Sequence, residues 1–103
     1  MYKIFTMVDL EKYKGFEWDK GNVDKNYQKH GISPNEAEEV FLDENLKILK
    51  DIKHSQKEER MIALGTTISG KKLFIVYTVR LEKVRIVSAR PMNKKERSNY
   101  EKT

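Results

Sequence analysis

The sequence predicts a single α+β domain. Helix-start signals gather in the first part of the chain, runs of β-branched and aromatic residues fill the second part, and the connections are short. With 103 residues, of which 38% are hydrophobic and 36% charged, the chain can bury only a thin core. We therefore expect two N-terminal helices, an antiparallel sheet of about four strands and a C-terminal helix, because short connections favour antiparallel neighbours. Residues 1–15 form an arm of uncertain structure, which could include a short strand, and residues 16–103 form the domain.

The first predicted helix covers residues 20–29. Residues 16–18 alternate apolar and polar like the end of a strand, and Asp19 follows as a helix N-cap. Gly31 ends the helix by supplying a left-handed residue. The inner stripe of this helix would hold Val23, Tyr27 and His30. For His30 a structural role at the helix end is favoured over catalysis, and Trp18 is expected in the core or as a helix anchor.

A second helix starts at Ser33-Pro34-Asn35-Glu36. Ser33 caps it, Pro34 takes the first helical position and Glu36 closes a capping box. An apolar face follows at the spacing i, i+3 and i+4, through Ala37, Val40 and Phe41.

The second part of the chain reads as strands. After a polar loop at residues 51–59, the strongest signal is an unbroken run of apolar, aromatic and β-branched residues, in which burial is the default for Tyr77. Pro91 stops the last strand, and Asn93 caps a C-terminal helix that ends at Lys102, with Tyr100 on the side that touches the sheet. The predicted strands are Leu46–Lys50, Met61–Gly65, Leu73–Val79 and Val84–Arg90.

Positive charge is concentrated in the last third of the chain. Residues 71–103 contain ten Lys or Arg and three Glu, a net charge of +7, whereas the whole chain carries +5. A clustered positive field attracts phosphates and releases their counterions, so this region is suited to a polyanion. A solvated face that keeps a small protein soluble explains the same charge, and charge alone leaves both interpretations open.

The composition does not support a disulfide-rich, thiolate-metal or membrane-spanning protein. Cysteine is absent, which removes disulfides and thiolate metal sites and fits a reducing compartment. No apolar run approaches membrane-spanning length. We expect a cytoplasmic protein without a metal or other cofactor, since the two histidines lie on different predicted elements.

Several motifs in register resemble the BrnT family of toxins from type II toxin–antitoxin systems, also known as the DUF497 family. The resemblance covers roughly residues 16–101 and departs from the family at Asn22 and at residues 91–93. It rests on Trp18-Asp19, Asn26, Lys29-His30-Gly31-Ile32, Glu36-Ala37, Val40-Phe41, His54-Ser55, Glu58-Glu59-Arg60, the strand Phe74–Thr78, residues 85–90, Glu96-Arg97 and Tyr100. It implies a RelE-like fold and a ribonuclease that blocks translation by cutting RNA. It also implies a BrnA-like antitoxin partner, which binds DNA through a ribbon-helix-helix domain.

The residues are compatible with a metal-free ribonuclease. Such an enzyme takes a proton from the ribose 2′-hydroxyl, stabilises negative charge on the phosphorane and protonates the leaving oxygen. Guanidinium stays charged and binds two phosphate oxygens in one plane, so arginines at strand ends are the first candidates. Arg60, Arg80, Arg85 and Arg90 lie at strand starts or ends, where their side chains can converge on one edge of the sheet. The predicted catalytic residues are His54, Glu59, Arg60, Arg80 and Arg90. The predicted RNA-binding residues are Lys53, Arg85, Lys94 and Lys95.

Alternatives remain for these roles. His54 can act near neutral pH, and Glu59 can act if it is partly buried. Arg85 is equally explained as a surface arginine paired with a glutamate. The alternative function is a non-catalytic basic module that binds RNA or an acidic protein partner. In either case a partner antitoxin would cover the basic surface with acidic residues and compete with RNA.

Overall fold

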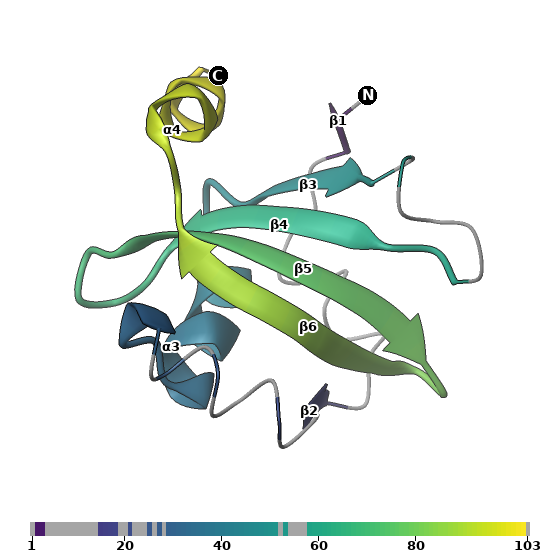
Figure 1. The fold of residues 1–103 in the computed structure, drawn as a ribbon. Coiled ribbons are helices and arrows are strands. Elements are labelled where there is room, and N and C mark those ends of the chain that lie inside the picture. Colours follow the sequence, from purple (N-terminus) through teal and green to yellow (C-terminus); the bar gives the residue numbers. More distant parts are fainter. Residues whose placement is uncertain are drawn as a thin grey trace.

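The structure, a computed structural model, describes residues 2–3, 15–18, 21, 25, 27, 29–51, 53 and 58–102. Figure 1 shows one sheet with a helix on each side, so the predicted α+β class is confirmed. The strands are β1 (Tyr2–Lys3), β2 (Phe16–Trp18), β3 (Lys47–Lys50), β4 (Met61–Thr66), β5 (Lys72–Arg80) and β6 (Lys83–Pro91). The helices are α3 (Pro34–Glu39), the 3₁₀ turn η1 (Val40–Leu42) that continues it, and α4 (Lys94–Glu101).

The sheet differs from the predicted antiparallel sheet of about four strands. It has six strands in the order β1-β3-β4-β5-β6-β2, and β2 runs parallel to β6. The four predicted strands are its centre, and the extra strands are the two- and three-residue segments at its edges. Segments this short carry too few residues for periodicity to show which neighbour they pair with.

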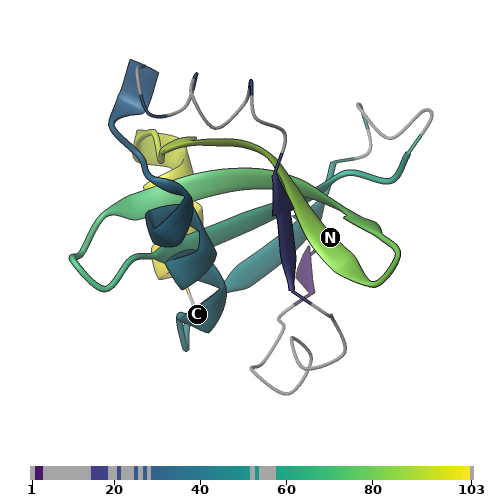
Figure 2. The ribbon, with the colours of Figure 1, turned by 90° about the horizontal axis from the view of Figure 1, so that it is seen from below.

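The segment α3–η1 packs on one face of the sheet, as Figure 2 shows from below. Its start is as predicted: Ser33 caps the helix, and Ser33 and Glu36 form the reciprocal capping box. Gly65 on β4 lets this segment approach closely, because a Cβ there would lie 2.6 Å from Val40 Cγ1. The buried core between segment and sheet includes Ala37, Val40, Phe41, Ile48, Ala63, Leu73, Ile75, Tyr77, Val84 and Ile86.

The helix predicted for residues 20–29 lies mostly outside the described residues. The described positions in it are helical, and the N–H of Gly31, at φ +67°, donates to the carbonyl of Tyr27 at 2.7 Å. Gly31 therefore ends the helix as expected. The prediction that Tyr27 faces inward is wrong, because its side chain is 61% exposed.

Helix α4 lies on the opposite side of the sheet from α3 (Figures 1 and 2). Asn93 caps it, and Tyr100 is buried with Leu64 and Met92, as predicted for the C-terminal helix. The hydroxyl of Tyr100 donates to Asp43 and lies 2.9 Å from Thr66 Oγ1. This anchor ties the end of α4 to the turn after η1.

A β-bulge in the central hairpin controls which side chains share a face. Val76 pairs with Ser88, but Tyr77 pairs with Ile86, so β6 holds one extra residue at this point. Residues 85 and 90 are an odd number apart and would face opposite sides of a regular strand. The bulge places Arg85 and Arg90 on the same face, away from α3.

Candidate active site

The face of the sheet opposite α3 carries most of the predicted site arginines. Tyr77 and Ile86 point into the core beneath α3, so their strand neighbours Thr78 and Arg85 point to the other side. Arg80, two residues after Thr78, shares that side. Helix α4 stands over the end of this face where β6 finishes (Figure 1).

An arginine cluster, consisting of Arg60, Arg80 and Arg85 around Glu58, lies at the end of the sheet where β4 starts and β5 ends. Arg80 donates two hydrogen bonds to the Glu58 carboxylate, one from Nε at 2.5 Å and one from Nη2 at 3.0 Å. Hydrogen bonds from Arg80, and then the charges of Arg80, Arg85 and Arg60, hold the pKa of Glu58 below its usual value. The fields of three arginines thus meet at one exposed carboxylate.

Arg85 lies one strand away within the same row of the sheet. It pairs with Thr78 on β5 and with Glu17 on β2, and its Nη1 is 3.9 Å from the Glu17 carboxylate. Thr78 is fully buried, and its hydroxyl has no hydrogen-bond partner within the described part of the chain. A buried hydroxyl without a partner is costly to the fold.

Arg90 is bound differently. Its Nη1 and Nη2 each lie 2.7 Å from an oxygen of Glu96, and its guanidinium stacks 3.9 Å from the centre of the Phe74 ring. Burial alone raises the pKa of Glu96, but hydrogen bonds from Arg90 and the Asn93 backbone outweigh it and lower the pKa. We call these four residues the Arg90 clip.

The clip and the cluster lie apart. Arg90 is paired with Phe74 and Arg85 with Thr78, and four residues along a strand span roughly 13 Å. The structure therefore brings Arg60, Arg80 and Arg85 together and separates Arg90 from them. The expectation that all four arginines converge on one edge is corrected by this spacing.

The remaining predicted residues are at the margins. Lys94 and Lys95 are exposed in the first turn of α4, and Lys53 is exposed in the polar loop before β4. The predicted role of Glu59 supposed a partly buried carboxylate, but this side chain is 62% exposed, 3.7 Å from Lys50 Nζ. His54 lies outside the described residues.

Sequence reasoning missed Glu58, Glu17 and Thr78. Glu58 is one of the quoted residues of the family motif but receives no role there, because its partner Arg80 is 22 positions away. Its role therefore depends on a strand pairing that no local pattern contains. In the sequence, Glu17 is only the polar member of an alternating strand, and Thr78 is only part of an apolar run.

Two kinds of feature are absent from the described residues. No group of three or more His, Cys, Asp or Glu side chains in these ranges is arranged to hold a metal ion. No helix among them is long and apolar enough to cross a membrane.

Comparison with known proteins places the chain. The family model described as "Ribonuclease toxin, BrnT, of type II toxin-antitoxin system" matches residues 18–96. The crystal structure of the Brucella abortus ribonuclease toxin, BrnT, has a similar fold, with a TM-score of 0.60 at 18% sequence identity, covering 78% of this chain and 97% of that one. No curated protein matches the chain. Since the family model spans more than half of the sequence, this chain belongs to the BrnT family of ribonuclease toxins of type II toxin–antitoxin systems.

Proposed function

We propose that this chain is a metal-independent endoribonuclease with a RelE-like fold that cuts RNA, inhibits translation and acts in the cytoplasm. A BrnA-like antitoxin with a ribbon-helix-helix domain would neutralise it. The observation that carries the proposal is the arginine cluster, in which Arg60, Arg80 and Arg85 surround one carboxylate on a sheet face that α4 covers only at its far end. Family membership supports the same activity.

The cluster supplies what the reaction requires at the phosphate. Cleavage by the 2′-hydroxyl adds negative charge to the phosphorane, and guanidinium donors stabilise that charge without a metal. Arg80 and Arg85 stand on adjacent strands, and Arg60 lies just before the strand on the other side of β5. A phosphate bound at the arginine cluster would therefore meet donors from three directions.

Glu58 is the base that this geometry favours. In the free protein Arg80 keeps the pKa of Glu58 low, which makes it a weak base. A substrate phosphate competes for Arg80, and once its hydrogen bonds with Arg80 are lost, the pKa of Glu58 rises toward its ordinary value. Binding of RNA would thus strengthen the base beside the 2′-hydroxyl. His54, a predicted catalytic residue whose role as acid or base the sequence leaves open, would then be the acid. Lys53, Lys94 and Lys95 would hold more distant phosphates, and Arg90 would do so if it leaves its clip.

Incubation of the purified protein with single-stranded RNA in excess EDTA tests the proposal. We expect cleavage to continue, and Arg60→Ala and Arg80→Ala each to slow it by roughly 100-fold, the size expected for loss of one oxyanion donor. Arg97→Ala is the matched control, since Arg97 is an exposed arginine on α4. It should cut like the wild type.

Two results would count against this mechanism. Loss of cleavage on chelation would contradict metal independence, and wild-type rates from Arg80→Ala would remove that residue from the site.

The pairing of Arg80 with Glu58 also favours a second candidate, a basic module that binds RNA or an acidic protein without cutting. An arginine that is already paired with a carboxylate can exchange it for a phosphate or for a carboxylate of another protein, and no bond needs to be cut. RNA that is retained at full length under the same conditions would support this function and exclude the first.

A further inference from the structure

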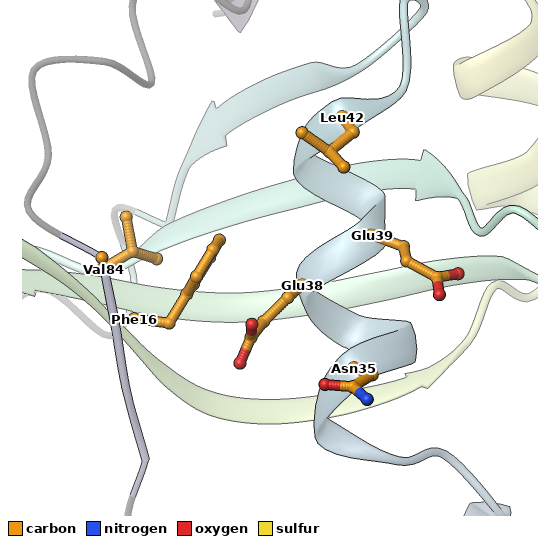
Figure 3. Close-up of a pocket in the computed structure, with 7 residues that line it drawn as sticks. Phe16, Asn35, Glu38, Glu39, Leu42 and Val84 are labelled. Carbon is orange, nitrogen blue, oxygen red and sulfur yellow. The ribbon is translucent and has the colours of Figure 1, made fainter.

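A pocket of about 450 Å³ opens beside α3, on the side of the sheet opposite the arginine cluster. Figure 3 shows its side chains, which come from β2, from β6 and from the α3–η1 segment. They include Phe16, Asn35, Glu38, Glu39, Leu42 and Val84.

Apolar side chains form the floor of this pocket. Phe16 and Val84 are neighbours across the parallel pair β2–β6, and the Phe16 ring packs 5.4 Å from that of Phe41 in the core. Leu42, at the end of η1, is 53% exposed although it belongs to a segment that is otherwise well packed. An apolar group placed here would remove Leu42 from water, which is favourable.

Carboxylates form the rim. Glu38 accepts a hydrogen bond from Trp18 Nε1 at 2.9 Å, and Glu39 accepts one from the Ile68 N–H at 3.0 Å. Both donors are neutral, so they fix the two side chains without cancelling their charge. Glu36, in contrast, is bound by Lys71 at 2.6 Å.

The charge around the pocket is opposite to that of the protein as a whole. Residues 31–46 contain five acidic residues and no Lys or Arg, in a chain of net charge +5. A cationic ligand is therefore attracted to this region and repelled by the arginine cluster. RNA phosphates are repelled here for the same reason.

We propose that the pocket binds a bulky apolar side chain presented by a cationic segment of the antitoxin, as an anchor separate from the arginine cluster. The partner's identity rests on the proposed function, whereas its chemistry rests on the apolar floor and anionic rim. A side chain such as Leu or Phe would cover Leu42 and Phe16, while a neighbouring Lys or Arg would meet Glu38 and Glu39. An apolar centre with a charged rim is the usual anatomy of a protein interface.

This anchor changes what neutralisation requires. An antitoxin that covers the arginines with acidic residues would also need a cationic stretch that reaches the other side of the sheet. Two contacts in one chain raise each other's effective concentration, so the antitoxin binds more tightly than either contact alone. Weakening the pocket should then weaken the complex while leaving RNA cleavage unchanged.

Two variants test the pocket through the fluorescence anisotropy of a labelled BrnA-like antitoxin. Leu42→Gln removes the apolar contact and should weaken binding by about tenfold or more, as for a central interface residue. The double variant Glu38→Gln/Glu39→Gln keeps both acceptor oxygens for Trp18 and Ile68 but removes two charges. It should slow association several-fold at low salt and less at high salt.

Matched controls separate this effect from general damage. Tyr27→Gln changes another exposed large side chain, 61% exposed and outside the pocket, and Glu44→Gln removes an exposed charge of the same acidic stretch. Both should bind antitoxin like the wild type. Thermal unfolding of each variant checks that the fold is retained.

Each outcome decides the proposal. Wild-type affinity for the antitoxin in both Leu42→Gln and the double variant would overturn it. A change in self-association of Leu42→Gln would also overturn it, because the pocket would then be a contact between two copies of the chain. Retained RNA cleavage with weakened antitoxin binding is the expected result. If the chain cuts no RNA, the proposed ribonuclease fails, but the binding measurements still report on the pocket.

Discussion

The arginine cluster and the Arg90 clip lie on the same face of one sheet, but the surroundings of the arginine differ. In the cluster the paired arginine is open to solvent, and in the clip it is packed into the fold. Arg80 is half exposed and holds an exposed glutamate that approaches from the loop before β4. Arg90 stacks on Phe74 and holds Glu96, which also accepts from the Asn93 backbone at the start of α4. The first pair can exchange its carboxylate for a phosphate at little cost to the fold, whereas the second pair is part of the fold.

The same contrast extends to the backbone and the core. The end of the sheet that carries the arginine cluster, here called the cluster end, finishes in the two-residue turn between β5 and β6. In this turn Leu81 and Glu82 have φ of +49° and +65°. The clip end is supported by a helix with a reciprocal cap and by the buried Tyr100. Backbone strain and exposed charge therefore gather at the end where chemistry is proposed, and packing gathers at the other.

The largest expected difference is in stability. Arg90→Ala removes a half-buried bidentate pair and its stacking on Phe74, and leaves Glu96 without its guanidinium partner, so the free energy of unfolding should fall by about 2–3 kcal/mol. Arg80→Ala removes a solvent-screened pair and should change the free energy of unfolding far less. Urea denaturation of both variants measures the difference. Equal losses would mean that the two ends are not distinct.

Local chemistry explains what the sequence predicted well. Ser33, Pro34 and Glu36 act within four positions, so their spacing alone specifies the helix start that the structure confirms. Asn93 and the buried side of Tyr100 follow from the same kind of short-range pattern. The family resemblance, carried by many such short motifs in register, is confirmed by the match over residues 18–96.

Long-range pairing explains what the sequence did not predict. Whether Arg85 and Arg90 share a face depends on one extra residue in β6, and a bulge leaves no signature in an apolar run. The parallel pairing of β2 with β6 brings Glu17 to Arg85 across 68 positions of sequence, which no window of local periodicity spans. The helical periodicity predicts that Tyr27 faces inward, but most of its side chain is exposed.

A smaller effect at the clip end should follow from Tyr100→Phe. The variant loses hydrogen bonds to Asp43 and Thr66, while Asp43 keeps the N–H groups of Thr66 and Asn45, so the expected loss is about 1–2 kcal/mol. Burial, followed by the bond to Asp43, raises the pKa of Tyr100 to about 12. The raised pKa favours the protonated phenol of the folded state, a contribution complete below pH 10 and lost as the pH rises through 12. Urea titrations of both proteins from pH 7 to pH 11 measure it, and an equal alkaline decline would contradict the assignment.

The smallest expected effect is a gain at the cluster end, from Leu81→Asn. Two-residue hairpin turns with positive φ at both positions favour Asn and Gly, and Leu pays a steric cost for the left-handed conformation that Asn largely avoids. Because Leu81 is 92% exposed, little packing is lost, and the free energy of unfolding should rise by about 0.5–1 kcal/mol. Urea denaturation checks the gain, and RNA cleavage measured beside it shows whether the strain has a function. A stabilised variant that cuts at the wild-type rate would make the turn a passive connection, whereas slower cutting would mean that the strained turn helps to place Arg80 against the phosphate.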